Sequence, residues 1–172
     1  MIETKRLIFR RWTKEDAAAL YALASDPEVG PHAGWPVHTS IEESRAVIKE
    51  YFSNDYTWAL VSKQTGAIIG CMGESNIDIG KEDAEVGYWI GRPYWNQGYC
   101  TEALYAMIGY CFNVKRFQTL WADYFIDNPA SGRVMDKCGF TDTGKKNYCS
   151  RLLHGDDKPI CVMRLDYSAY RP

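Results

Sequence analysis

The sequence predicts a mixed-sheet α/β fold, formed as a single domain over residues 1–172. Two observations lead to this fold class. Strand-like and helix-like segments follow one another along the chain, and no repeat, linker or low-complexity tract separates them. The length of 172 residues, the apolar fraction of 46% and the aromatic fraction of 14% are typical of one folded domain with a sizeable core.

The first third of the chain predicts one strand and two helices. Residues 6–12 alternate between apolar and polar side chains, as a first strand would. A capping-box pattern precedes a helix over residues 14–25, and a second one precedes a helix over residues 41–52. Between these helices, residues 26–40 are rich in proline and glycine and predict a loop.

The rest of the chain alternates between strands and two further helices. Glycine-containing turns and apolar runs separate these elements, and Asn128, Pro129 and Gly139 mark the start and the end of the last helix. The predicted strands are residues 56–63, 66–77, 84–91, 118–126, 144–153 and 159–167, and the predicted helices are residues 99–113 and 129–138.

Composition excludes several classes of protein. The formal net charge of −2 and the pI near 5.9 provide no basic footprint for nucleic acid. No apolar run approaches the ~18 residues of a membrane span, and the first residues lack the apolar core of a signal peptide. The six cysteines contain no C-x-x-C pair, so we expect free thiols, no metal site and a cytoplasmic protein.

A glycine turn between a predicted strand and a predicted helix is the most informative motif. Gly98 can adopt a positive φ, and Asn96 is one of the few other residue types that tolerate one. Small Cys100 allows backbone N–H groups to approach an anion, and Thr101 adds a hydroxyl donor. Neither the dinucleotide-binding glycine pattern nor the P-loop pattern is present. An ordinary strand-to-helix turn explains the same residues.

The stretches AEVGYWIGRPYWNQGYCTEAL and DNPASGRVMDKCGF resemble the GNAT acyltransferase superfamily, especially its ribosomal-protein N-terminal acetyltransferase branch. This resemblance extends over nearly the whole chain. The pyrophosphate loop of the family reads Gln/Arg-x-x-Gly-x-Gly/Ala, and this chain departs from it at Trp95 and Cys100. The resemblance implies a central, mostly antiparallel sheet flanked by about four helices. It also implies acetyl-CoA as the cosubstrate, with no metal.

The resemblance also implies which residues contact acetyl-CoA. The pantetheine arm would lie along the strand that ends with Tyr88, Trp89 and Ile90. Asn128 would contact the arm, although a role as the N-cap of the next helix explains this residue as well. The pyrophosphate would bind the backbone amides of Asn96, Gln97, Gly98, Tyr99, Cys100 and Thr101.

Transfer to an amine requires removal of a proton from the ammonium group. Glu85 lies where lysine-acetylating relatives carry their base, and Asp123 lies where a Rim-type relative carries a glutamate. Each could instead be an exposed ion-pairing residue, and Glu85 is the preferred base. A backbone N–H of residue 89 or 90 could stabilise the oxygen on which negative charge develops.

Many relatives protonate the departing thiolate with a tyrosine, but this chain has Met135 at the matching position. Ser131 matches a serine that has this role in the closer branch. A place in the first turn of the helix explains Ser131 as well. A thiol with a pKa of about 8.5 also leaves without assistance, so the reaction does not require this acid.

The family architecture places the acceptor beside the loop over residues 26–40, where His32 and Trp35 are the predicted contacts. Packing of Trp35 and solvation of His32 are the alternatives. Asp156 and Asp157 could attract a cationic amine or simply be solvated. The sequence shows no acidic concentration that would favour a polyamine.

We therefore expect an N-acetyltransferase acting on a primary amine, either a protein or peptide N-terminus or a small amine. Attack would be direct, in a ternary complex, and the family also allows a homodimer. A CoA-binding sensor without catalysis is the alternative function.

Overall fold

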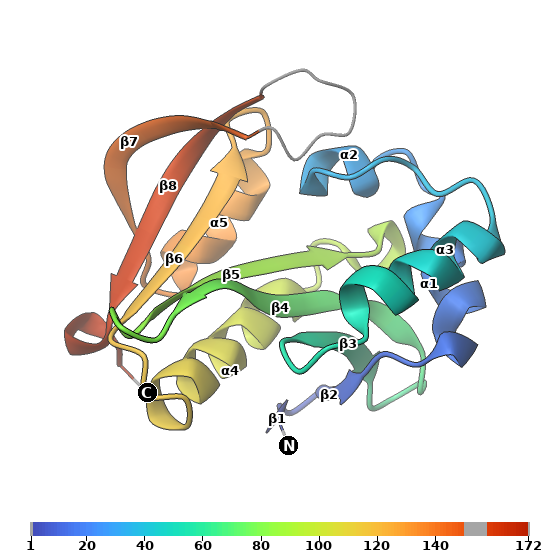
Figure 1. Ribbon diagram of the computed structural model, residues 1–172, viewed down its shortest axis with the longest axis horizontal. Coiled ribbons are helices and arrows are strands. Elements are labelled where there is room, and N and C mark those ends of the chain that lie inside the picture. The colour runs from blue at the N-terminus through green and yellow to red at the C-terminus, as the bar shows by residue number, and fades with distance from the viewer. Residues whose placement is uncertain (1, 150–157, 172) are drawn as a thin grey trace.

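The computed structural model describes residues 2–149 and 158–171, with only the backbone at residues 146, 148 and 149. Its strands form one eight-stranded sheet in the order β1-β2-β3-β4-β5-β6-β8-β7, which is antiparallel except for the parallel pair β5–β6 (Figure 1). The strands are β1 Ile2–Glu3, β2 Leu7–Arg11, β3 Thr57–Ser62, β4 Ile68–Asp78, β5 Asp83–Ile90, β6 Thr119–Phe125, β7 Thr141–Cys149 and β8 Lys158–Asp166.

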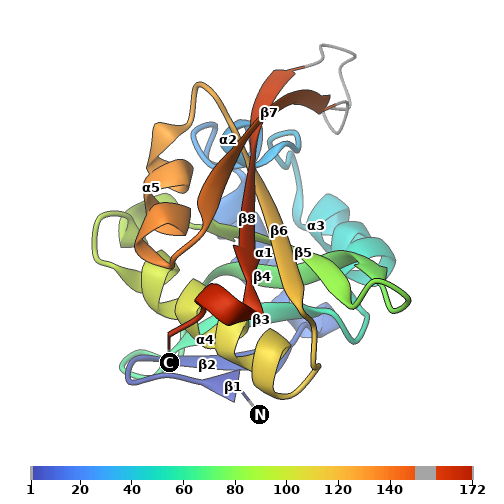
Figure 2. The same cartoon turned by 90° about the vertical axis from the view of Figure 1, so that its left-hand side faces the viewer.

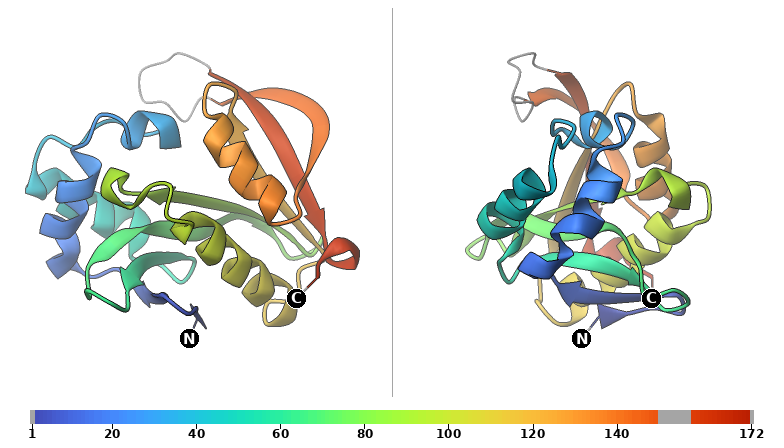
Figure 3. Two further views of the ribbon diagram at one scale, coloured as in Figure 1. Left: turned by 180° about the vertical axis from the view of Figure 1, so that it is seen from behind. Right: turned by 90° about the vertical axis from the view of Figure 1, so that its right-hand side faces the viewer.

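Helices cover both faces of the sheet. α1 and α3 lie over one face, and α4 and α5 lie over the other (Figures 1 and 3). α3 continues into a π-helical turn at Ile48–Phe52, and α2 is a short helix near the end of β5. The helix bounds are α1 Ala17–Ala24, α2 Gly30–Ala33, α3 Ile41–Val47, α4 Tyr99–Asn113 and α5 Pro129–Lys137.

Side-chain alternation along β5 divides the core into two parts. Val86 and Ile90 point to one face and pack with Leu104 and other apolar residues of α4. Trp89 points to the opposite face and packs in the cluster that contains Leu20 of α1. The end of β5, at Trp89 and Ile90, is therefore buried on both faces of the sheet, whereas Gly87 is exposed.

The strands β5 and β6 pair only at one end. The register runs from Asp83 opposite Thr119 to Glu85 opposite Trp121. Beyond this point the two strands diverge, and β6 continues beside β8 across the direction of β2, β3 and β4 (Figures 1 and 2). The backbone of β5 after Glu85 therefore has a free edge on the side of β6 among the described strands.

The predicted fold class is confirmed, and the helix predicted over residues 99–113 coincides with α4. The prediction of a continuous loop over residues 26–40 is wrong, because Gly30–Ala33 form α2 with Pro31 in its first turn. β1 has only two residues, too few for a sequence pattern.

The strand predicted over residues 144–153 begins earlier, at Thr141. A register shift between Asp142 and Lys146 allows the strand to continue through Gly144, whose φ is 71°. The predicted end of this strand and the turn with His154, Asp156 and Asp157 lie outside the described residues.

Candidate active site

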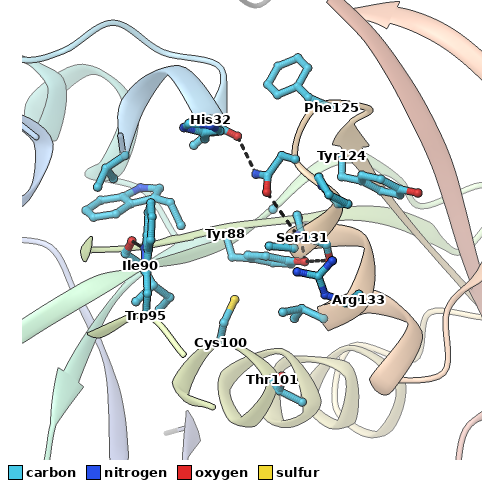
Figure 4. Close-up of a pocket in the computed structure, with 18 of the residues that line it drawn as sticks. His32, Tyr88, Ile90, Trp95, Cys100, Thr101, Tyr124, Phe125, Ser131 and Arg133 are labelled. Atoms are coloured by element: carbon cyan, nitrogen blue, oxygen red, sulfur yellow. Dashed lines mark hydrogen bonds between the residues drawn. The ribbon is translucent and has the colours of Figure 1, made fainter. Parts of the chain in front are cut away.

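A cavity of about 620 Å³ lies between the diverging strands β5 and β6 and is bordered by α2, the start of α4, and α5 (Figure 4). Gln97 and Trp35 are the two predicted site residues that are not among the described residues lining it. The predicted residues that line it are His32, Glu85, Tyr88, Trp89, Ile90, Asn96, Gly98, Tyr99, Cys100, Thr101, Asp123, Asn128 and Ser131.

The glycine turn has the predicted backbone conformation. Asn96 has a φ of 59° and Gly98 a φ of 76°, and α4 begins at the next residue, Tyr99. A Cβ on Gly98 would meet only the Nη2 atom of Arg6, at 3.6 Å, so its φ and not a lack of space requires glycine. Since the first N–H groups of a helix lack acceptors within the helix, this turn can bind an anion in the cavity.

Trp95, which departs from the family pattern, binds the backbone of β5. Its indole Nε1 donates to the carbonyl oxygen of Ile90 at 2.6 Å. The N–H of Gly91 donates to the carbonyl oxygen of Ile69 on β4 at 2.9 Å. Because successive backbone N–H groups of a strand point to opposite edges, the N–H of Ile90 points to the free edge of β5. Of the two predicted oxyanion donors, the backbone geometry therefore favours Ile90.

Gln97 stabilises the turn from outside the cavity. Its side-chain Nε2 donates to the carbonyl oxygen of Pro93 at 2.9 Å, which connects the turn to the 3₁₀ turn at Arg92–Tyr94.

Tyr88 crosses the cavity from β5 to α5. Its hydroxyl donates to the carbonyl oxygen of Ser131 at 3.1 Å and lies 3.1 Å from the Ser131 hydroxyl (Figure 4). Burial raises the pKa of Tyr88, so the phenol stays protonated at neutral pH. Cys100 points from the start of α4 toward Tyr88, and burial also raises the pKa of its thiol. The Cys100 thiol is consequently neutral where it lines the cavity.

Asn128 connects α5 with α2. Its Oδ1 accepts from the N–H of Ser131 at 3.4 Å, which is the predicted N-cap bond. Its Nδ2 donates to the carbonyl oxygen of His32 at 3.2 Å, across the mouth of the cavity (Figure 4). The side chain therefore acts as a cap and also holds α2 beside the cavity.

The two candidate bases lie on the two strands that part. Glu85 is at the last position of β5 that pairs with β6, where its Oε2 accepts from Asn76 Nδ2 at 2.7 Å, and Asp123 is on β6. Glu28 and Asp127 also line the cavity, and Asp127 pairs with Lys158 at 3.2 Å. Carboxylates from three separate segments thus gather at this site, although the sequence shows no such concentration.

The predicted acceptor residues have different surroundings. His32 lines the cavity, and its Nδ1 lies 2.8 Å from the carbonyl oxygen of Glu28. Trp35 packs edge-on against Trp89, with ring centroids 5.6 Å apart. A Cβ on Gly30 would lie 2.6 Å from the Trp35 ring, so this glycine permits the close packing. Trp35 therefore supports α2 through its close packing on Gly30. Any contact of Trp35 with the acceptor stays a prediction.

Sequence reasoning missed two basic residues of the cavity. Arg133 and Lys137 lie four residues apart on α5, on one side of the helix, and both line the cavity. Arg133 and Lys137 follow the helix start at Asn128 and Pro129 at a spacing of four residues, and this spacing is the sequence signal that could have identified them.

Two kinds of feature are absent from the described residues. They contain no group of three or more His, Cys, Asp or Glu that could hold a metal ion. Among the helices formed by these residues, none has the length and apolar character needed to span a bilayer.

Comparison with known proteins identifies the family. Residues 6–141 match the sequence profile of the acetyltransferase (GNAT) domain. The chain belongs to the GNAT acetyltransferase family. A relative from Bacillus subtilis, the uncharacterized N-acetyltransferase YoaA, is 30% identical over 149 residues, which cover 84% of each chain.

Solved structures agree with this family. A Vibrio cholerae protein provisionally named as a ribosomal-protein-serine acetyltransferase is 26% identical, with a TM-score of 0.83 and 96% of each chain covered. Spermidine N-acetyltransferase from Vibrio cholerae, solved with CoA and spermine, has a TM-score of 0.80, covering 97% of this chain and 99% of that one. Its identity of 15% shows a shared fold alone.

Proposed function

We propose that this GNAT protein transfers an acetyl group from acetyl-CoA to a primary amine, either a protein or peptide N-terminus or a small amine. Transfer would occur by direct attack while both substrates are bound. One observation carries the proposal: a single cavity joins the Gly98 turn to the two carboxylates, Glu85 and Asp123, at the point where β5 and β6 part.

The residues of the cavity suit acetyl-CoA. This cosubstrate supplies an acetyl group that is already activated as a thioester. The Gly98 turn and the first amides of α4 would hold the pyrophosphate, with Arg133 and Lys137 adding positive charge. The free edge of β5 offers backbone groups to the amide-containing arm, and the Asn128 side chain lies at the same opening.

The remaining residues would handle protons and charge. Glu85, or Asp123 on the opposite strand, would accept a proton from the attacking ammonium group, directly or through water. The N–H of Ile90 would donate to the acetyl oxygen as negative charge develops. The Ser131 hydroxyl would protonate the departing sulfur, with Tyr88 holding that hydroxyl in place.

The carboxylates that line the cavity also indicate that the site suits a cationic acceptor. An amine arrives as a cation, and Glu28, Glu85, Asp123 and Asp127 line the region that it must enter. The name of one structural neighbour, which is 26% identical, supports a protein acceptor. The carboxylates that line the cavity suit a small cationic amine as well. A homodimer and a cytoplasmic location stay predictions of the sequence.

The test combines calorimetry with an activity assay. Acetyl-CoA is titrated into the purified protein, and thiol release is then measured with spermidine and with short peptides that begin with alanine or serine. We expect binding, turnover with at least one amine, and a loss in kcat of about 10²–10⁴-fold in Glu85→Gln or Asp123→Asn. Glu15→Gln, an exposed carboxylate outside the cavity, is the control. Binding without thiol release for any amine would contradict the proposal and favour a CoA-binding module.

A further inference from the structure

The turn before α4 is contacted from outside the cavity by an arginine near the N-terminus. Arg6 lies between β1 and β2, and its Nη1 donates to the carbonyl oxygen of Gln97 at 2.9 Å. Its guanidinium carbon lies 4.1 Å from the centre of the Tyr99 ring. The Arg6 side chain thus touches Gln97 and Tyr99, the residues on both sides of Gly98, although about 90 residues separate Arg6 from them in sequence.

The same arginine binds a carboxylate in the first turn of α4. Arg6 Nε donates to Oε2 of Glu102 at 2.5 Å, and the Arg6 backbone N–H donates to Oε1 at 2.9 Å. The Thr4 hydroxyl donates to Oε1 at 2.6 Å. Burial raises the pKa of Glu102, but the hydrogen bonds from Thr4 and Arg6 together lower it below its ordinary value. Glu102 therefore stays ionised and paired.

The bond to Gln97 determines where the next N–H group points. In a trans peptide the carbonyl oxygen of one residue and the N–H of the following residue point in opposite directions. No cis peptide bond occurs among the described residues. Because Arg6 holds the Gln97 oxygen on the outside of the turn, the N–H of Gly98 is directed to the opposite side, where Gly98 lines the cavity.

The pairing with Glu102 has an electrostatic consequence. A carboxylate in the first turn of a helix stabilises that helix, but it repels an anion bound at the same end. Arg6 neutralises this charge and leaves the amides of the turn available to a second anion.

We propose that Arg6 is a positioning residue for the anion-binding turn, because it orients the Gln97–Gly98 peptide toward the cavity and neutralises Glu102. The inference rests on the proposed function, since it requires the pyrophosphate of CoA in this turn. Arg6 acts through the turn and does not itself touch the cosubstrate.

The test compares two acetyl donors, acetyl-CoA and S-acetyl-N-acetylcysteamine, which lacks the pyrophosphate. We expect Arg6→Gln to raise the KM for acetyl-CoA about tenfold, with kcat within about twofold of the wild type. The kcat/KM for the truncated donor should not change, which also shows that the variant is folded. Lys5→Gln, an exposed neighbour with the same charge change, should behave as the wild type.

A second variant tests the role of charge. Arg6→Gln/Glu102→Gln should have a KM for acetyl-CoA between those of the wild type and Arg6→Gln, because the unpaired carboxylate is gone. An unchanged KM in Arg6→Gln, or an equal loss with both donors, would overturn the inference while leaving the proposed function intact. Failure of the wild type to bind CoA would instead refute the proposed function itself.

Discussion

The hydroxyl groups of Tyr88 and Ser131 lie 3.1 Å apart and join β5 to α5 across the cavity. The family resemblance implies a tyrosine on the helix itself, at the position that Met135 occupies here, and Met135 is buried in the core. In this protein a tyrosine hydroxyl therefore reaches the start of α5 from the neighbouring strand.

Removal of that hydroxyl should affect both stability and turnover. Tyr88→Phe keeps the ring, so we expect a loss of about 1 kcal/mol in the free energy of unfolding. We also expect a fall in kcat, since the Ser131 hydroxyl loses its partner. Tyr88→Phe/Ser131→Ala should cost less activity than the sum of the single changes, because the two groups act together.

Tyr105→Phe is the matched control for this experiment. It removes a hydroxyl that donates to the Arg171 carbonyl oxygen, and Tyr105 is not among the described residues that line the cavity. This variant should lose stability alone. An additive result in the double variant would mean that Tyr88 and Ser131 act independently.

A pair of glycine substitutions separates backbone strain from anion binding. Gly98 and Gly66 have similar φ values, 76° and 72°, but only Gly98 borders the cavity. Gly98→Ala and Gly66→Ala should each destabilise the fold by about 1 kcal/mol, measured by urea unfolding. Calorimetry should show weaker CoA binding in Gly98→Ala alone. Equal CoA affinity in the two variants would argue against an anion at this turn.

Glu74 should make the protein less stable as the pH rises. This carboxylate is buried beneath α4; the Cys111 thiol contacts its Oε1, and its Oε2 has no hydrogen-bond partner among the described residues. Burial raises the pKa of Glu74, against a smaller effect of Lys115. Its contribution is therefore full below the unfolded pKa of about 4.3 and is lost as the pH rises through the higher folded pKa.

Urea unfolding at pH 5 and pH 8 provides the measurement for Glu74. Glu74→Gln should be more stable than the wild type at pH 8, and the difference should shrink at pH 5. A constant difference between the two pH values would show that ionisation of Glu74 is not involved.

His38 should make the protein less stable as the pH falls, which is the opposite of the effect of Glu74. It is buried, and its Nδ1 lies 2.8 Å from the Ser44 hydroxyl. Burial lowers the pKa of His38, partly offset by the charge of Glu43. Stability is therefore full above the unfolded pKa of about 6.5 and falls as the pH drops through it toward the folded pKa. His38→Gln should lose less stability than the wild type between pH 7.5 and pH 5.5 in thermal unfolding, and equal losses would contradict this role.

Local features of the sequence predicted much of the fold and part of the site. The glycine turn, the start of α4 and the Asn128 cap depend on neighbouring residues, so their patterns can be read along the chain. Asparagine is one of the few residue types that tolerate a positive φ, and Asn96 has a φ of 59°.

Features that depend on distant segments were not predictable in this way. The strands β5 and β6 diverge after Glu85 and Trp121, a position that depends on how two strands distant in sequence pair, and no residue pattern marks it. The sequence leaves an acceptor contact and packing as alternatives for Trp35, and its packing on Trp89 depends on the path of the whole loop. The contacts of Arg6 join residues about 90 positions apart, and its own surroundings in sequence give no sign of them.

The bond between Asn128 and His32 has a thermodynamic consequence. The Asn128 amide has two hydrogens, and one of them is directed to α2, where the acceptor is predicted to bind. If the other hydrogen binds the arm of CoA, both interactions require the same side-chain rotamer. Binding of the cosubstrate would then hold α2 in place, and by reciprocity an acceptor that packs on α2 would increase the affinity for CoA by the same factor. The two substrates would bind with positive cooperativity through a single side chain.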